Sequence, residues 1–104
     1  MRQSLLKLYY KKNKIKSPLI IFIHGAACDH TLWCYQNRYF FNKNFSTLTL
    51  DLPGHGENSS APLYKINDMT NLFKALIKKL PHQNIFLVGH SMGSLICMDI
   101  AINN

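Results

Sequence analysis

Acidic side chains are scarce in this 104-residue sequence: five Asp and Glu residues stand against twelve Lys and Arg residues, a formal net charge of +7. A basic balance can indicate nucleic acid or an anionic membrane as a partner. Here the lysines are spread along the chain and accompanied by many asparagines, which is typical of a solvated surface. We therefore expect no nucleic-acid partner.

Long apolar runs are also lacking. The longest wholly apolar stretch is residues 19–23, far short of the roughly 20 residues that cross a bilayer. The first residues show an apolar run broken by Lys7, with no small-residue cleavage site after it, so no signal peptide is indicated. We expect no membrane span and predict a cytoplasmic protein.

Cysteine is scarce, and the spacing of the cysteines fits neither a disulfide framework nor a metal site. Cys28, Cys34 and Cys97 are odd in number and form no C-x-x-C pair, which indicates free thiols in a reducing compartment. The histidines of the loops have no carboxylates at ligand spacing, which argues against a histidine metal centre. We expect neither a metal ion nor a cofactor.

The sequence does contain short apolar runs that alternate with amphipathic stretches. Strands are predicted near residues 6–10 and at 18–23, 46–52 and 85–88, and helices from Asp29 onward, at 68–80 and at 92–102. Asn67 or Asp68 is the expected cap of the middle helix. The first strand suits a sheet edge with one wetter side. The order predicts an α/β fold in three layers, with a mostly parallel sheet and helices on both faces.

Residues 84–95, NIFLVGHSMGSL, carry the clearest chemical motif. An apolar strand leads into GHSMG, residues 89–93, which opens an apolar helix, as a nucleophile elbow requires. The turn has no room for a Cβ at its glycines, and Ser91 at its apex must hold a strained backbone that lifts its hydroxyl out of the sheet edge. We predict Ser91 as a nucleophile and the amide of Met92 as an oxyanion donor.

The loops that follow parallel strands emerge at one edge of a sheet, where ligands bind in open α/β folds. Residues 24–27, 51–56 and 89–93 should therefore lie side by side, with the amide of Ala26 facing Ser91 and joining Met92 in an oxyanion hole. The histidines of these loops are better interpreted as fixing loop backbone than as chemical groups. The supporting residues we expect are His24, Gly25, Gly89, His90 and Gly93.

Three motifs, IFIHGAACDHTLW, LTLDLPGHGENS and LVGHSMGSL, resemble in order and spacing the N-terminal half of an α/β-hydrolase of the esterase, lipase and peptidase group. The resemblance extends from about Leu8 onward. It implies Ser91 as nucleophile, the amides of Ala26 and Met92 as the oxyanion hole, and a small-molecule acyl substrate. It also implies that residues 1–104 form a partial domain, a truncated α/β-hydrolase fold ending after the nucleophile-elbow helix.

The catalytic triad of that family runs in the order Ser, acid, His. After Ser91 this sequence has one acid, Asp99, interpreted as a solvated helix residue, and no histidine. We therefore expect a fragment of a serine hydrolase that acts on an ester, thioester or amide through an acyl-serine intermediate. Alone it should be inactive, and a complementary chain would supply the acid and the histidine. The alternative is a non-catalytic binding or assembly module that uses the same pocket or the unpaired edge strand.

Overall fold

A computed structural model describes residues 5–103. Residues 1–4, within the stretch where no signal peptide was indicated, and Asn104 lie outside the described part. The elements follow in the order β1 (Lys7–Lys11), β2 (Leu19–Ile23), the 3₁₀ helix η1 (His30–Trp33), α1 (Cys34–Asn42), β3 (Ser46–Asp51), α2 (Ile66–Lys79), β4 (Ile85–Gly89) and α3 (Met92–Ile102).

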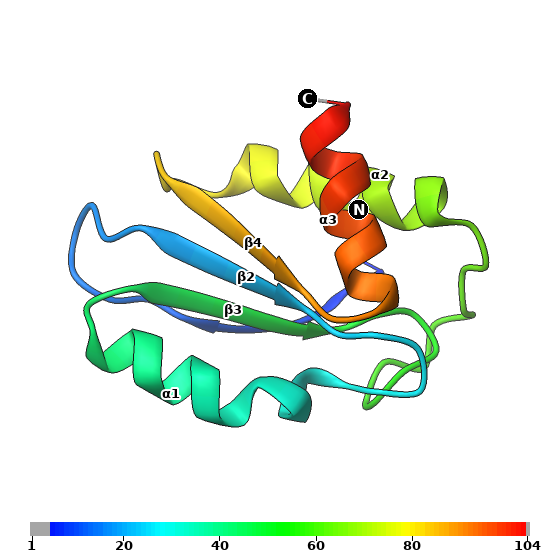
Figure 1. Ribbon diagram of the computed structural model, residues 1–104, viewed down its shortest axis with the longest axis horizontal. Helices are drawn as coiled ribbons and strands as arrows, with labels where there is room; N and C mark the ends of the chain where they lie inside the picture. Colours follow the sequence, from blue (N-terminus) through cyan, green and yellow to red (C-terminus); the bar gives the residue numbers. More distant parts are fainter. Residues whose placement is uncertain (1–4, 104) are drawn as a thin grey trace.

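The four strands form one sheet in the order β1-β3-β2-β4. Strand β2 pairs parallel with both β3 and β4, and β1 pairs antiparallel with β3. Helix α1 lies on one face of the sheet, and α2 and α3 lie on the other (Figure 1). The predicted three-layer α/β fold with a mostly parallel sheet is confirmed.

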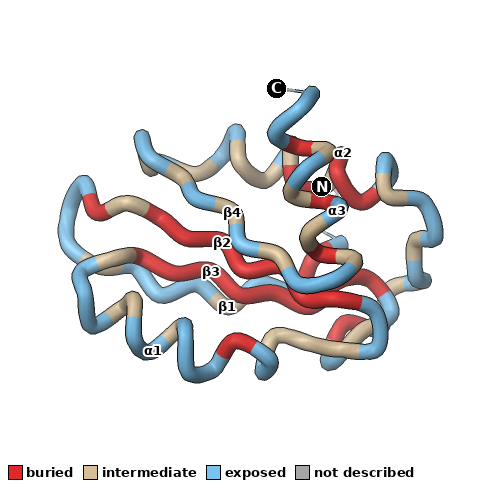
Figure 2. The backbone as a smooth tube through the Cα atoms, viewed as in Figure 1, coloured by how far each residue is buried: buried red, intermediate tan, exposed pale blue. Residues whose placement is uncertain are grey.

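The two central strands carry the core. Every residue of β2 and β3 is buried, whereas β4 alternates between half-buried and exposed residues (Figure 2). Ile21 belongs to the cluster that includes Phe73 of α2, and Phe22 belongs to the cluster with Trp33 of η1. Because both faces of β2 are apolar and covered, its register is strongly specified, and this places the loop after β2 at the carboxyl edge of the sheet.

The first strand lies at the sheet edge, as predicted, because among the described strands β1 is the outermost and pairs only with β3. Both of its sides border water: Leu8 and Tyr10 are 37% and 40% exposed, and Tyr9, on the opposite side, is half-buried.

The start of α2 differs from its prediction. The helix begins at Ile66, and its N-cap is Lys65, whose side chain makes no capping hydrogen bond. Neither Asn67 nor Asp68 is the cap, because both lie inside the first turn. Ile66 packs against the core, so burial of an apolar side chain, rather than a polar cap, accompanies the start of the helix. Asp68 still lies favourably at the positive end of the helix dipole.

Asp29 accepts a hydrogen bond from the amide of Thr31 at 2.8 Å and caps η1. Helix α3 spans the predicted residues. Strand β4 lies at the sheet edge, with Phe86 and Val88 exposed. Among residues 5–103, none of the helices combines the length and apolar character that a bilayer crossing requires.

Candidate active site

Ser91 lies at the apex of the elbow between β4 and α3. Its backbone has φ 56° and ψ −117°, a left-handed conformation that costs a non-glycine residue about 1–3 kcal/mol. The turn is closed by hydrogen bonds from the amide of Gly93 to the carbonyl of His90 and from the amide of Ser94 to the carbonyl of Ser91, each 2.9 Å long. The predicted strained, solvent-exposed serine is present.

The glycines of the elbow allow α3 to begin directly against the sheet. A Cβ on Gly93 would lie 2.8 Å from the carbonyl oxygen of His24 and would overlap the carbonyl of Ile23. A Cβ on Gly89 would overlap the backbone of Gly93. The first turn of α3 therefore packs backbone to backbone on the end of β2, as the sequence motif predicts.

The loop after β2 contacts the elbow through Gly25. A Cβ on Gly25 would lie 3.0 Å from both the carbonyl oxygen of His90 and the Cβ of Ser91. The amide of His90 donates to the carbonyl of Ile23 at 3.1 Å, which joins the two segments. Ala26 follows Gly25 directly, so the structure brings the predicted oxyanion loop to the serine.

Met92 is the first residue of α3. Its amide is one of the first four N–H groups of a helix, which have no carbonyl partner within the helix, and the helix dipole is positive there. The amide adjoins Ser91 in the chain, and the loop of Ala26 lies against the same turn. The oxyanion-hole role of these two amides stays a prediction.

His24 connects two of the three loops. Its side chain is fully buried; Nδ1 donates to the carbonyl of Gly25 at 2.7 Å, and Nε2 accepts the amide of Leu52 at 3.0 Å. Because the amide can only donate, Nε2 must be unprotonated. Burial lowers the pKa of His24, an effect that outweighs the hydrogen bond with Gly25. His24 therefore fixes loop backbone, in agreement with its interpretation from sequence.

The other two loop histidines are placed differently. Nδ1 of His55 lies 3.0 Å from the carbonyl of Pro53, so this ring also fixes loop backbone. His90 is exposed, and its ring lies beside Gly25. Within residues 5–103 no side chain makes a hydrogen bond with the hydroxyl of Ser91. None of the loop histidines is therefore positioned as its base.

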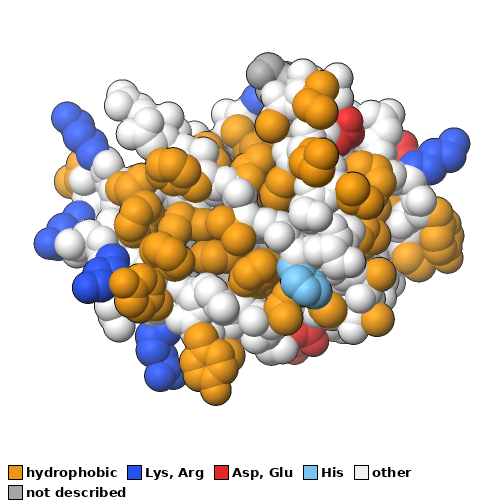
Figure 3. All heavy atoms as spheres, in the orientation of Figure 1, with side chains coloured by type: hydrophobic (Ala, Val, Ile, Leu, Met, Phe, Trp, Pro, Cys, Tyr) orange, Lys and Arg blue, Asp and Glu red, His pale blue; other side chains and the backbone are white. Residues whose placement is uncertain are grey.

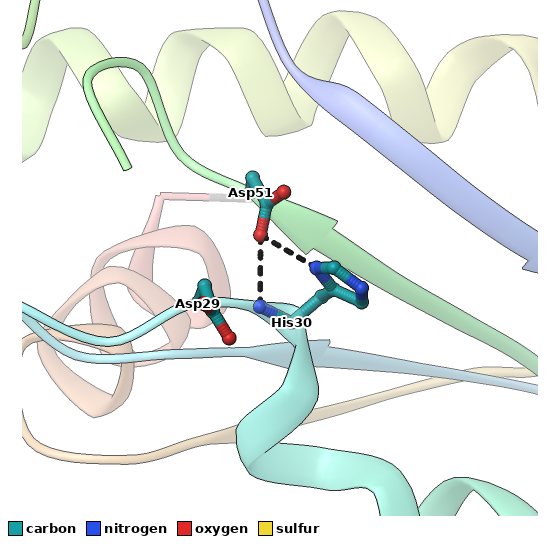
Figure 4. Close-up of side chains that lie close together, drawn as sticks. All are labelled: Asp29, His30 and Asp51. Carbon is teal, nitrogen blue, oxygen red and sulfur yellow. Dashed lines mark hydrogen bonds and ion pairs between the residues drawn. The ribbon is translucent and has the colours of Figure 1, made fainter. Parts of the chain in front are cut away.

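A buried carboxylate that the sequence analysis missed organises the same edge (Figure 4). Asp51, at the end of β3, is fully buried and accepts hydrogen bonds from the amide and Nδ1 of His30 at 2.8 and 2.9 Å. It also accepts from the amide of Glu57 at 3.1 Å and the hydroxyl of Tyr9 at 2.9 Å. Burial raises the pKa of Asp51, but these hydrogen bonds outweigh burial and the net pKa is lowered.

Asp29, His30 and Asp51 lie close enough together to be considered as metal ligands, with one donor atom from each within 4.8 Å of the others. The structure uses these atoms otherwise. Asp29 accepts hydrogen bonds from the amide and hydroxyl of Thr31, and Nδ1 of His30 is bonded to Asp51. These hydrogen bonds join His30 to Asp51 and hold the start of η1, so we assign the cluster a structural role.

Two surface depressions lie at opposite ends of the sheet. One of about 280 Å³ lies beside the loop of Ala26 and is lined by Ala27, Cys28, Asp29, Thr31 and Leu32. The other, of about 330 Å³, is lined by Lys12, Lys14, Ile15, Lys16, Pro81, His82, Gln83 and Asn84. The second lies at the amino ends of β2 and β4, away from Ser91, so only the first adjoins the candidate site.

Known proteins are similar to this chain in both sequence and fold. The chain is 31% identical over 88 residues to the 2-succinyl-6-hydroxy-2,4-cyclohexadiene-1-carboxylate synthase of Escherichia fergusonii, covering 85% of this chain and 34% of that protein. It is 34% identical over 86 residues to the (E)-2-((N-methylformamido)methylene)succinate hydrolase of Acinetobacter baylyi, covering 82% and 32%. The structure of a lipase-esterase related protein from Clostridium acetobutylicum matches with a TM-score of 0.84 at 24% identity, covering 96% and 42%.

The chain thus spans about a third of the length of these two curated relatives. Residues 18–104, most of the sequence, match the protein family described as alpha/beta hydrolase fold. The elbow, the glycine loop after β2 and the buried parallel strands agree with that match. This chain belongs to the α/β-hydrolase family.

Proposed function

We propose that the chain carries the nucleophile of a serine hydrolase that cleaves a small ester, thioester or amide through an acyl-enzyme on Ser91. One observation carries the proposal: Ser91 is held in a left-handed conformation between β4 and α3, against the backbone of Gly25. A serine in such a turn has its hydroxyl exposed at the edge of the sheet, where substrates reach it.

In the proposed reaction the hydroxyl oxygen of Ser91 attacks the acyl carbon, and the negative charge passes to the carbonyl oxygen. The amides of Ala26 and Met92 donate hydrogen bonds to that oxygen. Such a donor contributes about 2.7–4 kcal/mol to transition-state stability in other enzymes. The bond to the leaving group then breaks, and the leaving group takes the proton that a base removed from the hydroxyl of Ser91. Water hydrolyses the acyl-serine, which releases the carboxylic acid and restores the hydroxyl of Ser91. His24, Gly25, Gly89 and Gly93 act by holding the two amides and the serine in place.

The hydroxyl needs a base, because a serine at neutral pH is a weak nucleophile. Asp99 is the acid that follows Ser91 in the sequence. Its Oδ1 accepts a hydrogen bond of 2.7 Å from the side-chain amide of Asn103, one turn later at the C-cap of α3, and makes none with Ser91 among the described residues. We propose that the histidine and its acid come from polypeptide outside the 104 residues.

The free thiols of Cys28, Cys34 and Cys97 support a reducing compartment, the cytoplasm, as the site of action.

Chemical rescue tests the proposal. The chain is treated with a fluorophosphonate probe with and without free imidazole, which can stand in for a histidine side chain. We expect slow labelling of Ser91 that accelerates with imidazole concentration. Ser91→Ala should remove the labelled peptide, and Ser94→Ala, which changes the next serine along the chain, should leave it. The labelled residue is identified by mass spectrometry.

Two results would contradict the proposal. Labelling that persists in Ser91→Ala would exclude Ser91 as the nucleophile. Fast labelling without imidazole would show that the chain already holds a base, which would refute the external base.

A second candidate function, a non-catalytic assembly module, is favoured by the exposed apolar edge at Phe86 and Val88. Failure of imidazole to accelerate labelling of Ser91 would favour that function.

A further inference from the structure

The charges of this chain are sorted between the two ends of the sheet. The connection between β1 and β2 carries three lysines, and Lys43 precedes β3, so these lysines lie where the parallel strands begin. The acidic residues Asp29, Asp51 and Glu57 instead follow the carboxyl ends of β2 and β3. Figure 3 shows Lys and Arg side chains gathered on the left of this face, where the strands of Figure 1 begin, and Asp and Glu side chains in the right half.

The depression of about 330 Å³ at the basic end is lined by two segments, residues 12–16 before β2 and residues 81–84 before β4. Its volume is at the lower end of the range for small-molecule pockets, about 300–1,000 Å³. Lys12, Lys14 and Lys16 line it, and none of the five acidic residues of the chain does. Within residues 5–103 the one ion pair joins His30 to Asp51 at the other end of the sheet. The three ammonium groups therefore have no carboxylate partner among the described residues.

Hydrogen bonds hold the two walls of the depression together. Nδ1 of His82 donates to the carbonyl of Ser17 at 2.9 Å, because a carbonyl can only accept. In the neutral ring Nε2 then accepts from the hydroxyl of Tyr10 at 2.6 Å. The amide of Leu19 donates to the carbonyl of Asn84 at 2.9 Å. The walls are thus already ordered, which lowers the entropic cost of binding a ligand.

The turn before β2 adds backbone donors to the lysines. The amide of Ser17 donates to the carbonyl of Lys14 at 3.0 Å and closes the turn, in which Lys16 has φ 66°. The amides of Ile15 and Lys16 donate to no residue in the described part of the chain. Turns with amides of this kind form concavities that bind anions.

We propose that this depression binds a phosphate-bearing anion. A phosphate group carries more than one negative charge at neutral pH and has three strong acceptor oxygens, which the ammonium groups of Lys12, Lys14 and Lys16 can satisfy from different sides. No arginine lines the depression, although the planar fork of arginine is the group that best matches a carboxylate. The site lies at the opposite end of the sheet from Ser91, so the inference does not rest on the proposed function.

The phosphate can belong to a soluble molecule or to a lipid headgroup. Ile15 is 87% exposed between two of the lysines. An apolar side chain among lysines is also an arrangement that binds anionic membranes. The test therefore has one arm for each source.

The first arm is isothermal titration calorimetry of the chain with inorganic pyrophosphate at fixed ionic strength. Citrate, which carries a similar charge on carboxylates, is the control anion and should bind more weakly. Replacing both Lys12 and Lys14 with Gln should weaken pyrophosphate binding about tenfold or more. Replacing both Lys7 and Lys65 with Gln is the matched control. It removes the same charge from exposed positions near the other end of the sheet and should leave the affinity unchanged, and circular dichroism checks that each variant folds.

The second arm is sedimentation with vesicles of phosphatidylglycerol, compared with vesicles of phosphatidylcholine. A lipid source predicts that the chain sediments with phosphatidylglycerol and that the Lys12 and Lys14 variant does not. A soluble source predicts pyrophosphate binding without sedimentation.

Three results would overturn the inference: no binding in either arm, equal affinity for citrate and pyrophosphate, or equal losses in the two double variants. Ser91→Ala should bind pyrophosphate as the wild type does. Weaker binding by that variant would place the anion at the candidate active site and would also refute the inference.

Discussion

Replacing His24 with Phe tests whether this buried imidazole holds the candidate site together. Phenylalanine offers a ring but no donor or acceptor. The buried amide of Leu52 would lose its partner at 3.0 Å, whereas the carbonyl of Gly25 would lose the bond of 2.7 Å from His24 but keep the amide of Cys28 at 3.2 Å. A buried polar group without a partner costs about 1–3 kcal/mol, so the free energy of unfolding at pH 7 should fall by about 1–3 kcal/mol.

Urea unfolding followed by fluorescence measures this change, because Trp33 is the only tryptophan and is buried. His82→Phe is the matched control. His82 is half-buried at the other end of the sheet and bonds the carbonyl of Ser17 at 2.9 Å. Its replacement should cost only about 0.5–1.5 kcal/mol, the net value of an ordinary hydrogen bond.

The pH dependence gives an independent signature. Burial lowers the pKa of His24 in the folded protein, whereas the unfolded value is about 6.5. Between the two values the unfolded chain binds more protons, so stability rises with pH and is lost as the pH falls below about 6.5, with a slope of at most about 1.4 kcal/mol per pH unit. His24→Phe lacks this contribution. A difference in stability between wild type and variant that does not shrink from pH 7 to pH 5 would refute the reasoning.

Three further outcomes are expected. Gly93→Ala should lower the free energy of unfolding by about 3 kcal/mol, because its Cβ would meet backbone at the end of β2; a neutral effect in urea unfolding would contradict the packing. The lowered pKa of Asp51 contributes stability above an unfolded value of about 3.9 that is lost as the pH falls through the folded value. Asp51→Asn should therefore flatten acid unfolding followed by circular dichroism, and an unchanged profile would exclude this role. Burial raises the pKa of Cys97 to about 11, so iodoacetamide at pH 8 should alkylate exposed Cys34 first, and the reverse order by mass spectrometry would contradict it.

Local pattern in the sequence was enough to predict the parallel strands, α3 and the strained turn at Ser91. These features depend on a few adjacent residues: a run of isoleucines, two glycines around a serine, a helical spacing of apolar residues. The loop of Ala26 was also predicted to meet the elbow, because parallel strands deliver their loops to one edge of the sheet.

Only the tertiary structure decided the rest, because it depends on residues far apart in the chain. Asp51 organises the carboxyl edge of the sheet partly because it accepts a hydrogen bond from the hydroxyl of Tyr9. Tyr9 lies 42 residues away in the sequence, so the sequence alone does not show the contact. The start of α2 at Ile66 and the acceptor role of His24 toward Leu52 are likewise set by packing between segments. Local propensity does not predict such contacts, because the sequence around one residue does not show which distant residue will satisfy its buried polar group.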